Sequence, residues 1–346
     1  MLSLKVLRKI EQLKAAGATI IGNKTASTAS LVGDIISAEK ERETIANKLW
    51  NNTPLSIITQ KTAKNVLLEK GIAEDCLFNN TNDTTVNFDF IHRKKDGEDY
   101  YFISNQMPYN TTTLATFRMT DRQPELWNPV TGENRLLNDF KQDNGRTIIP
   151  LKFGAYESYF IVFRSPIKPI LNTKTKQPNF IELIDNQILT GSWQVKFDPK
   201  WGGLPNVTFD SLYSWTKHKN DGIKYYSGTA IYTKTFDFGT PQYETAFLDL
   251  GDVKDVGVAK IKLNGQDLGI VWCPPFRVNT RGLLKEKGNI LEIEVTNSWR
   301  NRLIGDRTQP LEKQLTRTNI TVKPEWQLEE SGLMGPVKIL INAVKN

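Results

Sequence analysis

Residues 261–269 read IKLNGQDLG and give the clearest indication of the fold of the last part of the chain. An Asn-Gly pair between runs of alternating apolar and polar residues is the strongest short signal for a β-hairpin, because both residues accept the positive φ of a type I′ turn. Residues 291–295 then read LEIEV, a pattern that predicts a strand with one buried and one solvent-facing side. We therefore expect residues 166–346 to form an all-β sandwich.

Upstream, residues 76–165 contain a second series of short alternating segments. They lie at 86–90, 100–104, 113–119, 124–127, 146–151 and 159–163. Turn-forming pairs such as Asn128-Pro129 and Asn144-Gly145 separate them, and short strands at this spacing predict another β-sandwich. The two prolines within Ser165–Pro169 indicate an extended linker between the sandwiches.

The first 75 residues follow a different pattern. Apolar residues recur at helical spacing over 2–16, and Gly17 is a suitable residue to end that helix. Further helices are predicted over 39–50, with Ser37 as cap, and over 62–70. Short strands are predicted at 18–21 and 55–59. Such alternation is typical of α/β units with a parallel sheet, but two strands bury too little area to stand alone. We therefore expect residues 1–75 to be an incomplete α/β domain. The chain as a whole is then mainly β.

Composition excludes several functions. The formal charge is +7, but 45 basic residues are interspersed with 38 acidic ones in no long run, so nucleic acid is not an expected partner. No apolar stretch is long enough to span a membrane. The two cysteines and two histidines form no recognised ligand spacing, so we expect no metal and no cofactor.

Hydrolysis of a glycosidic bond requires two carboxyl groups about 5 to 10 Å apart across a sugar. Glu292 and Glu294 share one face of a predicted strand, but they alternate with a clean apolar set, which favours a solvent-facing pair. Asp249, Asp252 and Asp255 do not match a known calcium loop. We therefore predict no catalytic residue in this chain.

Sugar binding has more support, because the apolar faces of sugars stack on aromatic rings and their hydroxyls need polar partners. Six of the eight tryptophans follow the predicted linker. Trp193 and Trp272 are predicted to lie in the core. The candidate carbohydrate-binding residues are Trp201, Trp215, Trp299, Arg300 and Arg302, with a purely structural role as the alternative for the tryptophans.

Several motifs carry a resemblance to a known family. They are AGATIIG (16–22), KLW (48–50), YFISNQ (101–106), SGTAIY (227–232), PPF (274–276), GNILEI (288–293), NSWRNRLIGD (297–306) and SGLMGPV (331–337), together with the Leu263-Asn264-Gly265 hairpin. The chain resembles the C-terminal half of family 106 of the glycoside hydrolases, the large bacterial α-L-rhamnosidases. The resemblance covers nearly the whole chain.

The resemblance implies a galactose-binding-like sandwich of jelly-roll type at residues 166–346 and the tail of an amidotransferase-like domain at 1–75. In that family the catalytic acids and the metal site lie in a (β/α)8 barrel, and no position here corresponds to it. We therefore expect an accessory portion of an α-L-rhamnosidase-like enzyme that acts on plant-type glycans without being catalytic itself. The full-length parent is expected to be exported.

Two alternatives stay open. One is a stand-alone carbohydrate-binding module, whose partner is carbohydrate. The other is a structural subunit that completes a separately encoded catalytic-barrel polypeptide, and this alternative predicts an exposed apolar face on residues 1–75.

Overall fold

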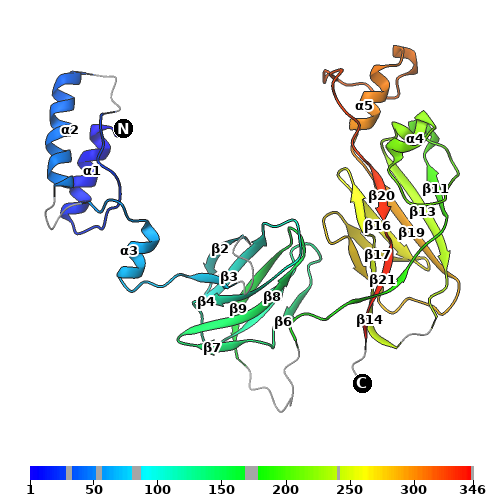
Figure 1. Ribbon diagram of the computed structural model, residues 1–346, viewed down its shortest axis with the longest axis horizontal. Helices are drawn as coiled ribbons and strands as arrows, with labels where there is room; N and C mark the ends of the chain where they lie inside the picture. The colour runs from blue at the N-terminus through cyan, green and yellow to red at the C-terminus, as the bar shows by residue number, and fades with distance from the viewer. Residues whose placement is uncertain (29–32, 52–56, 80–86, 168–177, 240–241, 344–346) are drawn as a thin grey trace. The chain divides into compact units, whose positions relative to one another are not determined.

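The computed structural model describes residues 1–28, 33–51, 57–79, 87–167, 178–239 and 242–343. These residues divide into two compact units, Met1–Leu77 and Phe78–Asn346 (Figure 1). The second unit contains nearly all of two β-sandwiches, which we call the middle sandwich (residues 76–167, whose first strand begins two residues before the boundary) and the last sandwich (residues 178–343). The expected fold class, mainly β with an N-terminal α/β remnant and two β-sandwich domains, is confirmed.

The first unit is built from three helices, α1 (Leu4–Ala15), α2 (Ile35–Trp50) and α3 (Ala63–Glu69). Its small core consists of Leu7, Ile45, Leu49 and Ile57. The sequence predicts two short parallel strands in this unit. Among its described residues, these two segments share a single parallel bridge, between Ile21 and Ile58. Residues 55 and 56 of the second expected strand lie outside the described residues.

Helix α2 begins earlier than the sequence pattern predicts. Asp34, not Ser37, is its N-cap, and the Asp34 carboxylate accepts hydrogen bonds from the backbone N–H groups of Ile36 and Ser37. The Ser37 hydroxyl donates to the same carboxylate. A carboxylate is as good a cap as a hydroxyl, so the earlier of the two capping residues starts the helix.

The middle sandwich packs two antiparallel sheets. One has the order β2 (Phe88–Lys95), β3 (Glu98–Asn105), β9 (Ser158–Pro166), β5 (Arg122–Trp127) and β6 (Asn134–Leu136); the other has β1 (Cys76–Asn79), β4 (Thr111–Phe117), β8 (Arg146–Phe153) and β7 (Lys141–Asp143). Tyr101 on β3 meets Phe117 on β4 across the core, with ring centroids 4.9 Å apart. Strand β9 continues through Pro166, so the start of the predicted linker is a strand; Lys168 and Pro169 lie outside the described residues.

The last sandwich contains a six-stranded sheet, a four-stranded sheet and a two-stranded ribbon. The first has the order β12 (Val207–Phe209), β11 (Trp193–Phe197), β13 (Thr229–Phe236), β19 (Asn289–Thr296), β16 (Val258–Leu263) and β17 (Gln266–Val271). The second has β10 (Ile184–Ile188), β21 (Lys338–Ala343), β14 (Tyr243–Asp249) and β18 (Arg277–Asn279). The ribbon pairs β15 (Asp252–Lys254) with β20 (Gly332–Gly335).

The predicted hairpin is present at the predicted residues. Leu263 pairs with Gln266, and Asn264 and Gly265 between them have φ values of 53° and 80°. On β19 the alternation also holds, since Leu291, Ile293 and Val295 are fully buried. Strand β13, which pairs with β19, begins at Thr229, a few residues after the short helix α4 (Asp221–Lys224).

Two further findings concern the surface of the described residues. None of their helices has both the length and the apolar character needed to cross a lipid bilayer. On α1, Val6 and Leu13 are exposed, and so are Leu67 and Leu68 on α3. Residues 6 and 13 are two helical turns apart and therefore share one face of α1.

Candidate functional site

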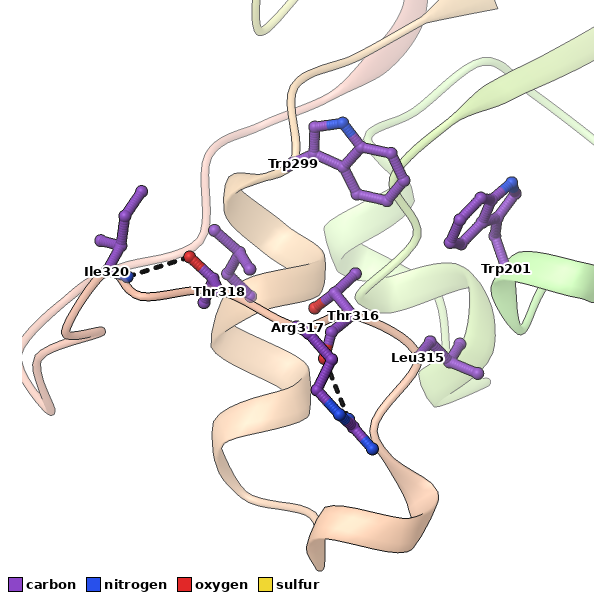
Figure 2. A pocket seen from close by; sticks show the side chains of 8 residues that line it. Trp201, Trp299, Leu315, Thr316, Arg317, Thr318 and Ile320 are labelled. Atoms are coloured by element: carbon purple, nitrogen blue, oxygen red, sulfur yellow. Dashed lines mark hydrogen bonds between the residues drawn. The ribbon is translucent and has the colours of Figure 1, made fainter.

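A hollow of about 440 Å³ lies beside helix α5 (Arg300–Arg307) in the last sandwich (Figure 2). Trp201 and Trp299 meet edge to face, with ring centroids 4.9 Å apart and an interplanar angle of 74°. Leu303 from α5 and the segment 315–320, which follows the short helix η3 (Leu311–Lys313), complete its lining. We call this feature the tryptophan hollow. Figure 1 shows α5 beside α4 at one end of the sandwich.

The loop that carries Trp201 is fixed by close packing. Trp201 ends the short helix η1 (Pro199–Trp201), which Asp198 caps by accepting a hydrogen bond from the backbone of Lys200. Two residues after Trp201, a Cβ atom at Gly203 would lie 2.4 Å from the Cβ of Phe197, so only glycine fits. Burial raises the pKa of the Tyr226 hydroxyl, which therefore stays protonated and donates to the carbonyl of Thr229.

The loop before Trp299 is held by two side-chain clamps. The Asp255 carboxylate accepts hydrogen bonds from both the backbone N–H and the hydroxyl of Ser298, each at 2.8 Å. The Asn297 side chain accepts from the backbone of Gly228 and donates to the carbonyl of Tyr226. These contacts keep the Trp299 ring in place although 47% of the residue is exposed.

Two side chains of helix α5 hold the segments that pack beside the hollow. The Asn301 side chain donates to the carbonyl of Glu329 at 2.8 Å and accepts from its N–H at 2.9 Å. One oxygen of the Asp306 carboxylate accepts from both the backbone N–H and the hydroxyl of Thr316, at 2.8 and 2.6 Å. Asp306 therefore fixes the irregular segment that carries Leu315 and Arg317.

The structure brings together two of the five predicted site residues, Trp201 and Trp299. Neither arginine lines the hollow. The Arg300 guanidinium lies over the ring of Trp326 at 5.0 Å. Arg302 is 7% exposed, and its Nη1 lies 3.4 Å from Asp306. Its side chain therefore lies behind the lining residues and not on the surface of the hollow.

The prediction that Trp215 contributes to a binding surface is wrong. Its ring is fully buried and packs edge to face against Phe197 and Tyr226, with centroids 5.4 and 5.6 Å away. Its indole N–H donates to the hydroxyl of Tyr232. The residues around Trp215 are polar like those of a loop, but this loop closes the end of the sandwich core.

The prediction that Trp272 lies in the core is also wrong, because 56% of the residue is exposed. Strand β17 ends at Val271, and Trp272 begins the following loop. Trp193, by contrast, lies in the core as predicted.

Sequence reasoning missed Leu315, Arg317 and Ile320. They lie in a segment without regular secondary structure, so no periodicity could have identified them. The sequence offers one signal for this segment, the Asp306 carboxylate at the end of the NSWRNRLIGD motif. Asp306 binds Thr316, which lies ten residues further along the chain.

Three of the acidic residues considered for catalysis or metal binding, Glu294, Asp249 and Asp255, are engaged elsewhere. Glu294 pairs with Lys262 at 3.0 Å on the outer face of the sheet, and Asp249 pairs with Arg277 at 2.7 Å. Asp255 clamps Ser298, as described above. Among the described residues that line the tryptophan hollow there is no carboxylate, histidine or cysteine, so this hollow offers surfaces for binding but no acid or base.

Residues 1–141 of the chain match the family model described as alpha-L-rhamnosidase, which is family 106 of the glycoside hydrolases. A putative beta-glucuronidase from Formosa agariphila is 36% identical over 269 residues, which make up 68% of this chain and 22% of that protein. A rhamnosidase structure from Novosphingobium sp. PP1Y is similar over 98% of this chain and 32% of that chain, with 30% identity and a TM-score of 0.76.

The fold and these matches define a chain related to glycoside hydrolases and built largely from β-sandwiches. Within that class it is similar to the C-terminal portion of a family 106 enzyme, and the resemblance stated from the sequence motifs is confirmed. The chain spans about a third of the rhamnosidase chain and about a fifth of the curated relative.

Proposed function

We propose that this chain is an accessory portion of an α-L-rhamnosidase-like glycoside hydrolase that acts on plant-type glycans, and that it holds saccharide without cleaving it. The observation that carries the proposal is the tryptophan hollow, which presents two indole rings and no carboxylate. Concave sites with aromatic walls and a few polar groups are typical of ligand binding.

We expect the purified chain to release no nitrophenol from nitrophenyl α-L-rhamnoside above the rate in buffer. The reason is that Glu292 and Glu294 face away from the core, and Glu294 is already paired with Lys262. Absorbance at the nitrophenolate band measures the rate. Release that disappears in Glu292→Gln or Glu294→Gln would contradict the proposal.

A carbohydrate-binding module that works independently is the second candidate, and the exposed edge-to-face pair of Trp201 and Trp299 favours it. On a glycan array, Trp299→Ala should weaken the signal roughly tenfold, which corresponds to about 1.4 kcal/mol of lost stacking. Trp272→Ala is the matched control, because it removes an exposed tryptophan that does not line this hollow. Equal losses in both variants would place binding elsewhere.

A third candidate is a structural partner of a catalytic-barrel polypeptide. The exposed Val6 and Leu13 on one face of α1 favour it, since apolar patches on a surface mark interaction sites. Capture of a barrel-containing protein by the wild-type chain, and its loss in the double variant Val6→Ser, Leu13→Ser, tests this candidate. Capture that is unchanged in the variant would exclude this face as the contact.

A further inference from the structure

One cation, Arg317, lines the tryptophan hollow, and a second, Lys200, contacts the ring of Trp201 in its lining. The Arg317 guanidinium donates only to backbone carbonyls, those of Leu311 at 2.8 Å, Thr316 at 3.1 Å and Gln314 at 3.3 Å. Lys200 lies over the Trp201 ring at 5.4 Å. Within the described part of the chain, neither cation has an acidic side chain within 4.0 Å.

A third cation lies directly behind the lining of the hollow. Arg302 is 7% exposed, and its Nε and Nη2 atoms are buried without a hydrogen-bond partner among the described residues. A Cβ atom built on Gly202 would lie 3.6 Å from this Nη2 and 2.9 Å from the Cδ1 of Leu315. The guanidinium is therefore next to Leu315 and to the glycine that follows Trp201.

Two carboxylates, those of Asp198 and Asp306, lie close to these cations in the structure, and both already accept hydrogen bonds. Asp306 lies 3.4 Å from Arg302 and accepts two hydrogen bonds from Thr316. Asp198 caps the short helix η1. Asp306 thus offsets the charge of Arg302, whereas Lys200 and Arg317 have no such partner. Since Coulomb interactions strengthen beside apolar groups that exclude water, these two cations leave the hollow with an excess of positive charge.

We propose that the tryptophan hollow takes an anionic saccharide, one that carries a carboxylate or a sulfate group. This inference rests on the proposed saccharide binding and adds the chemical class of the ligand. The indole rings contact the apolar face of a sugar, and the cations attract its acidic group. Arginine in particular matches the planar, forked geometry of a carboxylate. A neutral sugar would use the rings and leave the charges unmatched.

Calorimetric titration with a galacturonate trisaccharide and with its methyl ester tests the inference, because the two ligands differ in charge and share one backbone. We expect the ester to bind at least roughly tenfold more weakly, the size of one charge-assisted hydrogen bond. Binding of the acid should also weaken as salt is added. A sulfated galactan oligosaccharide and its desulfated form make a parallel pair that separates sulfate from carboxylate as the preferred group.

Variants of the cations sharpen the result. Lys200→Gln and Arg317→Gln should each weaken the acidic ligand several-fold and leave the ester unchanged, whereas Lys200→Arg should retain affinity. Lys141→Gln on β7 is the matched control for net charge, because this exposed lysine lies in the middle sandwich. Lys200→Gln keeps the test valid if Arg317→Gln unfolds the wall, since the Lys200 side chain contacts only the Trp201 ring among the contacts described.

Three outcomes are distinguishable. Tighter binding of an acidic ligand than of its neutral counterpart, lost in Lys200→Gln, supports the inference. Equal affinity for the acid and the ester, and for the sulfated and desulfated forms, overturns it and leaves the proposed function standing. Failure of every saccharide to bind overturns both.

Discussion

Replacing Trp215 with alanine should destabilise the last sandwich by about 3–5 kcal/mol, the usual cost of deleting a large buried ring. The ring is fully buried against Phe197 and Tyr226, and Gly332 packs so closely that a Cβ there would lie 2.5 Å from the indole Nε1. No collapse can fill such a space without moving β20. Hydrogen exchange of peptides from β13 and β19 measures the opening free energy of this sandwich separately from the rest of the chain.

The matched control is Trp272→Ala. This tryptophan is mostly exposed, and surface substitutions usually change stability by less than about 0.5 kcal/mol. The sequence predicts a surface role for Trp215 and a core position for Trp272, and the structure shows the reverse. Similar protection from exchange in both variants would contradict the assignment of Trp215 to the core.

Replacing Asp306 with alanine should cost about 3–5 kcal/mol, because breaking a buried ion pair leaves its partner uncompensated. The Arg302 guanidinium, which already has two unpartnered nitrogens, would lose its ion partner. Thr316 would lose the acceptor of both its N–H and its hydroxyl. Exchange of peptides that cover α5 and residues 311–320 measures the effect, together with the melting temperature.

Two further variants separate the ion pair from a general loss of charge. Asp252→Ala removes a carboxylate that is 66% exposed and 3.3 Å from Lys254, and such surface pairs are worth at most about 1 kcal/mol. Adding Arg302→Met to Asp306→Ala should recover part of the loss, because the buried charge is then absent. A double variant no more stable than Asp306→Ala would show that the bonds to Thr316 matter more than the ion pair.

The sequence identified those parts of the fold whose signals are local. The Asn264-Gly265 hairpin and the alternation on β19 depend on neighbouring residues, and both were predictable. The start of α2 was misplaced because both Asp34 and Ser37 are good caps, and only the structure shows which one accepts the backbone hydrogen bonds.

The candidate site was only half predictable, for a physical reason. Trp201 and Trp299 lie far apart in the sequence, and their contact depends on how η1 and α5 meet at one end of the sandwich. Trp215 lies in a polar, turn-like stretch that resembles a surface loop, yet it closes the core. Trp272 follows an apolar run that resembles a strand, yet it projects beyond the last paired residue. Tertiary packing determines which side chains are buried at the ends of a sandwich. The periodicity of the sequence therefore does not predict it.

The most direct test of the account is a proton NMR time course of a plant-type oligosaccharide with terminal α-L-rhamnose, mixed with the purified chain. We predict broadened saccharide resonances, sharper again in Trp299→Ala, while the anomeric signals keep constant intensity over days. The growth of anomeric signals from free rhamnose, at a rate proportional to the concentration of the chain, would contradict the account, because it would show that this portion cleaves what it binds.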